Sequence, residues 1–314
     1  MKSAESPRLR LNIPRGINEF ETCVLVQIKN SVGKSGKNDP ADVEIIRSLL
    51  VRHRQWVETD LTNTTLTENV LVAAIMKFQE TACALARPDG RVDPNGFTLK
   101  RLNMASIPRP AHRVFRNVCW NPGPALTDKD FIAAAKKLGC EKEAIQTVAI
   151  VETKRQANDS SGRPTILFER HKFRLFTGGA YNSTHPDISG PQGNYGRESI
   201  QYAKLYRAAV LNEEAALKSA SWGAFQIMGF NHKSAGYGTV SAFVDAMIGS
   251  QSSHLDAFVS HIAASSSLKN AIIKKDWTTF ARLYNGPDFK INMYDTQMEN
   301  EYKRLIAKKA ANRS

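Results

Sequence analysis

Long apolar runs and paired cysteines are both missing from this 314-residue chain, and each absence excludes a class of protein. The longest uninterrupted apolar stretch, residues 70–76, is far shorter than the roughly 20 residues that span a bilayer, which excludes a transmembrane protein. The four cysteines are scattered without a CxxC pair or a zinc-like histidine spacing, so we expect free thiols and no metal. Residues 1–16 lack the apolar core of a secretory signal, and we therefore expect synthesis in the cytoplasm.

Acidic residues are the scarcer charge, because 30 of them stand against 43 basic residues and leave a net charge of +13. Such an excess indicates a polyanionic partner, and nucleic acid, anionic lipid and bacterial cell wall all qualify. The excess is spread along the chain and no zinc-finger, basic-zipper or RNP-like pattern is present, so we expect no nucleic acid and keep it as the runner-up. Hydrophobic residues at 42% and charged residues at 23% are typical of a folded globular protein.

The length predicts two domains, because single cores rarely grow to this size. Residues 1–38 are polar, and we expect a tail or arm there. Residues 39–105 show helical apolar spacing, and the proline- and arginine-rich residues 106–124 predict an extended linker. Residues 125–314 are patterned almost entirely as helices, except that 162–192, rich in Gly, Pro, Ser and Asn, predict loops and a small hairpin. The predicted fold class is mainly α.

Glu152 is the most informative single residue. Ile145 and Val148 recur at helical spacing, and Glu152 continues the same stripe, so a carboxylate is predicted on the face toward the core. Burial and the negative end of the helix dipole both disfavour its ionised form, as a general acid requires. The alternative is an ion pair with Lys154 or Arg155 at the helix end.

Glu169, in the later segment LFERH, is a candidate for a second carboxylate. An inverting glycosidase needs such a group, about 6.5–9.5 Å from the acid, to activate water. The alternative is a buried ion pair with Arg170, Arg174 or Arg207. Asp187 is a weaker second candidate for the same role.

Two further segments carry side chains suited to sugars. In SASWGAFQIMGFN, Trp222 and Phe225 could stack on sugar rings and the Gln226 amide could bind hydroxyl or acetamide groups. The alternative is a buried turn whose aromatic side chains belong to the core. In LYNGPDF, Tyr284 and Asn285 end a predicted helix, which a Schellman-type stop also explains.

Taken in order, these pieces resemble the lysozyme superfamily, in particular goose-type lysozymes and lytic transglycosylases. The segments AIVETK, GRPTILFERHKF, SASWGAFQIMG, DWTTFARLYNG and MYD are similar to the N-acetylmuramidase domain of phage endolysins, over residues 125–305. The resemblance implies a lysozyme-like catalytic domain with Glu152 as its catalytic acid. It also implies a sugar cleft lined by Trp222, Phe225, Gln226, Tyr284 and Asn285.

The N-terminal part has a resemblance of its own. ADVEIIRSLL, LTENVLVAAIMKFQE and DGRVDPNGFTLKRL are similar to the small three-helix peptidoglycan-binding domain. The matching positions, which the resemblance implies for wall binding, are Phe78, Gln79, Asp89 and Thr98. The alternative is a helical domain that only tethers or regulates the enzyme.

These observations predict a modular endolysin that hydrolyses the β-1,4 bond between MurNAc and GlcNAc of peptidoglycan, as a monomer and without cofactor or metal. A lytic transglycosylase and a non-catalytic wall-binding protein are the alternatives. The basic helix expected at residues 302–313 could contact an anionic outer-membrane surface, although a solvated helix face explains it as well. We expect the protein in the host cytoplasm until a holin-type pore opens, and then in the periplasm and cell wall.

Overall fold

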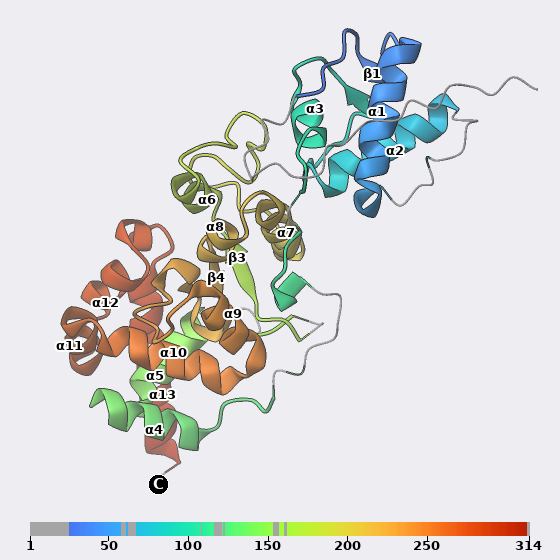
Figure 1. The fold of residues 1–314 in the computed structure, drawn as a ribbon. Helices are drawn as coiled ribbons and strands as arrows, with labels where there is room; N and C mark the ends of the chain where they lie inside the picture. The colour runs from blue at the N-terminus through green and yellow to red at the C-terminus, as the bar shows by residue number, and fades with distance from the viewer. Residues whose placement is uncertain are drawn as a thin grey trace, which may run out of the picture. The chain divides into compact units, whose positions relative to one another are not determined.

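The computed structural model describes residues 25–57, 61, 67–107, 109–115, 121, 123–152, 157–159 and 162–312. Helices dominate, with short strands in two small antiparallel sheets (Figure 1). The chain divides into two compact units, one formed by residues 1–76 with 89–106 and the other by residues 77–88 with 107–314. No helix among the described residues combines the length and the apolar character needed to cross a bilayer.

The first unit is built on α1, and its start is well capped. The Asp39 side chain accepts a hydrogen bond from the amide of Ala41, and Pro40 occupies the first helical position. The helical bounds are α1 (Pro40–Arg52), α2 (Glu68–Thr81), whose last turn is counted with the second unit, and α3 (Phe97–Leu102).

Residues 25–38 are an integral part of the first unit, which corrects the expectation of a tail there. Strand β1 (Val32–Gly33) pairs antiparallel with β2 (Arg91–Val92). The buried carboxylate of Asp42 accepts hydrogen bonds from the amides of Lys29 and Asn30, at 3.0 and 2.8 Å. The rest of the expected tail, residues 1–24, lies outside the described residues.

The second unit is a helical assembly around one small sheet. Strand β4 (Ala220–Trp222) lies between β3 (Ile166–Phe168) and β5 (Ile227–Met228), with both pairs antiparallel. Its helices are α4 (Asp128–Leu138), α5 (Lys142–Glu152), α6 (Arg170–Phe176), α7 (Gln201–Leu211), α8 (Glu213–Lys218), α9 (Val240–Gly249), α10 (Gln251–Ala263), α11 (Ser266–Lys274), α12 (Trp277–Tyr284) and α13 (Tyr294–Ala311).

Helix α5 is held firmly in this unit. Its residues Ile145 and Val148 are fully buried, as the sequence pattern predicts. Helices α4 and α13 pack against it, and Figure 1 shows these three helices close together with α10. At its N-terminal end the buried Glu143 pairs with Lys309 of α13, 3.0 Å away. The position of the last residue of α5 is therefore fixed by the core and by a neighbouring helix.

Helix α6 lies where only loops and a small hairpin were expected, between residues 162 and 192. Its seven residues, RHKFRLF, carry three positive charges and bury only Phe173 completely. Such a short and basic segment shows no strong apolar stripe, so its helical state depends on packing against the rest of the unit. Strand β3, which precedes it, has its partner β4 some fifty residues later in the chain.

Part of the expected linker is packed against the second unit. Residues 111–115 include a short 3₁₀ helix, η2 (Arg113–Phe115), and Val114 is 1% exposed. The backbone amides of Ala111 and His112 donate to the carboxylate of Glu213 at 2.6 and 3.0 Å. This corrects the expectation of an extended connector over these residues.

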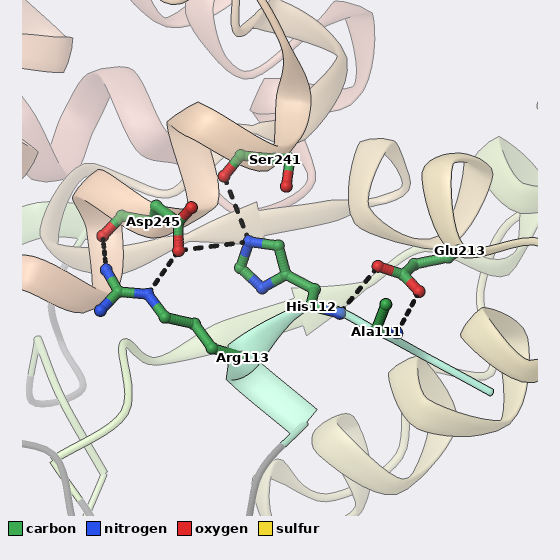
Figure 2. A pocket seen from close by; sticks show the side chains of 6 residues that line it. All are labelled: Ala111, His112, Arg113, Glu213, Ser241 and Asp245. Atoms are coloured by element: carbon green, nitrogen blue, oxygen red, sulfur yellow. Dashed lines mark hydrogen bonds and ion pairs between the residues drawn. The ribbon is translucent and has the colours of Figure 1, made fainter.

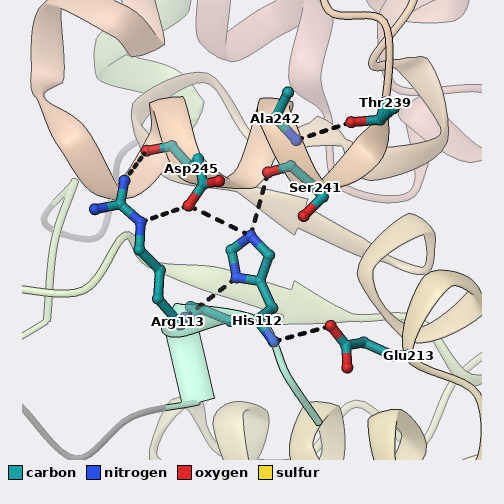
Figure 3. A network of polar contacts seen from close by, with 8 residues as sticks. His112, Arg113, Glu213, Thr239, Ser241, Ala242 and Asp245 are labelled. Atoms are coloured by element: carbon teal, nitrogen blue, oxygen red, sulfur yellow. Dashed lines mark hydrogen bonds and ion pairs between the residues drawn. The ribbon is translucent and has the colours of Figure 1, made fainter.

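Two side chains of the same segment contact α9, and the surrounding residues form a shallow pocket (Figure 2). His112 Nε2 lies 3.2 Å from the carbonyl oxygen of Ser241, and Arg113 pairs with Asp245. Figure 3 shows that these contacts join the segment to the first turn of α9, which Thr239 caps. Because its carboxylates are already paired, we interpret this pocket as an anchor for residues 111–115.

Candidate active site

Glu152 is the last residue of α5 and is half-buried. Its Oε1 accepts a hydrogen bond from Nδ2 of Asn285, at 2.7 Å. Asn285 is the residue at which α12 ends, so two helix ends separated by 133 positions meet at this carboxylate. Of the basic partners considered from the sequence, Lys154 and Arg155 lie outside the described residues.

Tyr284 precedes Asn285 and supports the same junction. Its hydroxyl group donates to the carbonyl oxygen of Phe225, at 2.7 Å. Burial and the negative charge of Glu152 both raise the pKa of Tyr284 well above its ordinary value, so the phenol stays neutral and remains a donor. The predicted grouping of Glu152, Tyr284 and Asn285 is therefore present in the structure.

The amide of Asn285 is only half satisfied. Its nitrogen binds Glu152, whereas its oxygen Oδ1 is buried and has no hydrogen-bond partner among the described residues. A buried unsatisfied carbonyl oxygen costs about 1–3 kcal/mol. Such a cost beside a carboxylate is typical of a site that is completed by a ligand.

Trp222 and Phe225 are core residues, which corrects the expectation that they form a wall of the sugar cleft. Each is 1% exposed. The Phe225 ring stacks on Phe258 with the ring centroids 4.4 Å apart, and the indole N–H of Trp222 donates to the carbonyl of Leu217. Neither ring has a face left for a sugar, so both support the site from behind.

The Gln226 amide is occupied by internal hydrogen bonds. It accepts from Ser221 Oγ at 2.7 Å and donates to the carbonyl oxygens of Gly223 and Thr165 at 2.8 and 3.1 Å. Gln226 itself has a left-handed backbone, with φ 48°. The side chain thus ties the residue before β3 to the turn between β4 and β5, a structural role that the sequence did not indicate.

Glu169 lies directly after β3 and occupies the N-cap position of α6. Its amide donates to the carbonyl of Ser219 at 2.9 Å, which fixes the backbone next to β4. Burial raises the pKa of its carboxyl group. The side-chain partner is His171, whose Nε2 lies 3.2 Å from Oε2 of Glu169.

Two of the three arginines considered as partners of Glu169 are engaged elsewhere. Arg170 donates to the carbonyl oxygens of Pro191 and Pro186. Arg207 donates to both carboxylate oxygens of Asp187, at 2.6 and 3.1 Å. Asp187, the weaker second candidate for a water-activating group, is therefore one half of an ion pair.

A loop connects the surroundings of Glu169 with the segment that follows Asn285. The Gln192 amide donates to Asp288 at 3.2 Å, three residues beyond Asn285. Burial and the charge of Glu169 raise the pKa of Tyr195 in the same loop, which places its phenol within the electrostatic reach of that carboxylate. Sequence reasoning did not select either Gln192 or Tyr195 of this loop.

The residues proposed for wall binding divide into buried and exposed. Phe78, Gln79 and Thr98 are at most 7% exposed, so they cannot contact a polymer directly, which corrects that expectation. Asp89 is exposed, and its carboxylate accepts from the amide of Arg91 at 3.0 Å. Among the described residues no three metal-ligating side chains cluster.

Comparison with known proteins identifies a family model and similar solved structures. Residues 141–306, more than half of the chain, match a family model described as Muramidase: N-acetylmuramidase. The crystal structure of Burkholderia AP3 phage endolysin is similar, with 32% identity and a TM-score of 0.54, over 89% of this chain and 98% of that chain. No curated protein matches this chain.

The match to the muramidase family and the similarity to a phage endolysin show a glycoside hydrolase with a lysozyme-like, mainly helical fold. The chain belongs to the N-acetylmuramidase family, whose substrate is peptidoglycan. The expected mainly α fold class, the enzyme class and the C-terminal muramidase domain are thereby confirmed. An N-terminal peptidoglycan-binding domain stays a prediction.

Proposed function

We propose that this chain is a phage endolysin that cleaves the β-1,4 bond between MurNAc and GlcNAc, with Glu152 as general acid. The contact between Glu152 and Asn285 carries this proposal, because it places a half-buried carboxyl group at the junction of two helices of the muramidase domain. The similarity to the Burkholderia AP3 phage endolysin supports the biological role.

A general acid must hold its proton until the glycosidic bond breaks. Glu152 lies at the C-terminal end of α5, where the helix dipole and partial burial both favour the neutral form. The Asn285 amide donates to Oε1, so the proton occupies Oε2. From Oε2 it passes to the leaving glycosidic oxygen.

Glu169 is the candidate for the general base. Its raised pKa lies closer to a neutral working pH than that of an exposed carboxyl group, which suits a group that removes a proton from water. The activated water attacks the oxocarbenium-like carbon, and no covalent enzyme intermediate forms. If the C6 hydroxyl group of MurNAc attacked in place of water, the enzyme would be a lytic transglycosylase.

The function is tested by mass spectrometry of muropeptides released from purified peptidoglycan and reduced with borohydride. The wild-type chain is expected to release products with reducible MurNAc ends, and Glu152→Gln none above background. Glu214→Gln, which alters an exposed carboxylate paired with Lys218, is the matched control and should behave as the wild type. Full release by Glu152→Gln would refute the assignment of the acid.

We also propose that the N-terminal helical part of the chain, residues 39–105, holds the enzyme on peptidoglycan, with Phe78, Gln79 and Thr98 contributing through packing and Asp89 through its exposed position. Co-sedimentation with peptidoglycan tests this idea in the Glu152→Gln background, where the polymer stays intact. The added Asp89→Ala change should leave more of the chain in the supernatant. An unchanged distribution would remove Asp89 from the binding surface.

In the infected cell we propose that the monomeric chain waits in the host cytoplasm and reaches the periplasm and wall through a holin-type pore. An anionic outer-membrane surface is a weaker partner, because several cations of α13 already pair with carboxylates: Lys303 with Glu299, Arg304 with Glu301 and Lys309 with Glu143. Expression with and without a pore-forming protein tests this route, and lysis is expected only with the pore.

A further inference from the structure

His171 lies two residues after Glu169, yet the two side chains meet. Residues two apart within a helix normally point in different directions. Here Glu169 precedes α6 in an extended conformation, with φ −106° and ψ 99°, and this geometry turns its carboxylate toward the imidazole. Nε2 of His171 lies 3.2 Å from Oε2, and the two side chains are only 22% and 19% exposed.

The other ring nitrogen indicates which protonation state is present. Nδ1 of His171 is buried and has no hydrogen-bond partner among the described residues. A proton there would be a buried unsatisfied donor, which is costlier than an empty lone pair. Burial and the charge of Lys172 also lower the pKa of His171. Both observations favour a neutral ring with its only proton on Nε2, beside Glu169.

Building on the function proposed above, we propose that His171 is a positioning residue that holds the carboxylate of Glu169 in one orientation and in its ionised form. Nε2 lies 3.2 Å from the carboxylate oxygen, and a proton on this nitrogen stabilises the negative charge of the carboxylate. The contact can shorten when substrate excludes water, as catalytic hydrogen bonds commonly do. His171 itself does not exchange protons with the substrate.

Besides His171, other groups around Glu169 also affect the pKa of its carboxyl group. Lys172, on the same helix, lowers the pKa of Glu169, and burial raises it. Tyr195 approaches from the loop, and its neutral phenol feels the charges of Glu169 and, less strongly, of Asp288. His171 is the side chain whose nitrogen the structure places beside the carboxylate of Glu169, at 3.2 Å.

The direction of the expected effect follows from the role of the base. A base works only when ionised, so the acidic limb of the profile of kcat/KM against pH reports the pKa of Glu169. Removing a donor from the charged form raises that pKa. The acidic limb should then move to higher pH by about one unit.

The experiment measures initial hydrolysis of peptidoglycan, at concentrations below KM and across pH, by the full chain and its variants. His171→Phe should shift the acidic limb upward by about one pH unit. His171→Gln, which can present an amide N–H at the position of Nε2, should restore most of the wild-type profile. Lys172→Met should shift the same limb less than His171→Phe does.

Either of two results for His171→Phe would overturn the role of His171: an acidic limb that stays in place, or a shift of equal size in the Glu169→Gln background. A fully active Glu169→Gln variant with the wild-type profile would overturn it too, while an inactive Glu152→Gln variant would leave the proposed acid standing. Activity retained in Glu152→Gln would instead refute the proposed function itself. If His171→Phe does not fold, the acidic limbs of His171→Gln and Lys172→Met test the role of His171. The proposal expects a smaller shift in His171→Gln than in Lys172→Met, and the reverse order would overturn it.

Discussion

The two candidate carboxylates of the muramidase domain lie at opposite ends of helices. Glu152 is the last residue of α5 and contacts an amide, whereas Glu169 is the N-cap of α6 and contacts an imidazole. The C-terminal end of a helix disfavours negative charge and the N-terminal end favours it. Burial affects both groups, so in the mechanism that we propose the helix ends and the neighbours distinguish the protonated acid, Glu152, from the ionised base, Glu169.

Of all the exchanges considered, Glu152→Gln should lower the rate of wall hydrolysis the most. Glutamine keeps the size and the hydrogen bond to Asn285 but has no proton to donate, and general acids contribute about 10²–10⁴-fold to rate. Turbidity loss of wall suspensions should fall by that range in Glu152→Gln and stay within about twofold in Glu214→Gln. Comparable rates in Glu152→Gln and Glu214→Gln would contradict a catalytic role of the Glu152 carboxyl group.

Glu169→Gln should lower the rate by about 10²-fold, near the lower end of the same range. Its remaining activity should no longer fall on the acidic side of the pH profile, because the group whose protonation stops the wild-type enzyme is gone. Rates measured from acidic to neutral pH check this. A residual profile with the wild-type acidic limb would assign that limb to another group.

Asn285→Ala should lower kcat by about tenfold, because the orientation of the Glu152 carboxyl group is lost while its proton remains. The exposed Asn292 provides a matched asparagine-to-alanine control, for which no change is expected. Single-turnover rates on soluble peptidoglycan fragments separate this effect from binding. An increase in KM alone would make Asn285 a substrate ligand and not a support of the acid.

Gln226→Ala should act mainly on stability. Its amide makes three internal hydrogen bonds that alanine cannot replace, so we expect a loss of about 1–3 kcal/mol of unfolding free energy. Urea denaturation measures this loss. An unchanged unfolding midpoint together with a raised KM would instead favour the sugar-binding role that the sequence suggested.

Arg113→Ala should have the smallest effect, because its pair with Asp245 is about half exposed on both sides. Exposed pairs contribute about 0–1 kcal/mol, so the unfolding free energy should fall by no more than that and wall hydrolysis should be unchanged. Urea denaturation and turbidity assays check the two statements. A large loss of activity would give the packed segment 111–115 a function beyond anchoring.

The half-buried position of Glu152 at the end of α5 could be predicted from the sequence, because Glu152 continues a stripe of core residues. Its role as the acid stays a prediction, based on the rule that such conflicts with local patterning are expected at functional sites. The mainly helical fold follows from the same periodicity. The prediction that Trp222 and Phe225 form a wall of the sugar cleft was wrong for a physical reason. Aromatic side chains suit a protein core and a sugar-binding surface equally well, and only the three-dimensional packing shows that each is 1% exposed.

The surroundings of Glu169 could not be predicted. They depend on α6, whose sequence has little apolar periodicity, and on the contact between Gln192 and Asp288, which are 96 positions apart. Sequence reasoning also looked for an arginine beside Glu169, whereas the structure places His171 there. Arg170 and His171 both follow Glu169 directly in the sequence, so either was a possible partner. The extended backbone at Glu169 determines that its carboxylate contacts His171.

The proposal that Glu152 is the general acid and Glu169 the general base is tested most directly by the anomeric configuration of the newly formed reducing end. Proton NMR of soluble peptidoglycan fragments, recorded within the first minutes of hydrolysis by the wild-type chain, identifies the anomer before it equilibrates. An acid and a separate water-activating base predict inversion, so the α-anomer of MurNAc should appear first. Initial release of the β-anomer, or of a 1,6-anhydro end, would contradict this mechanism.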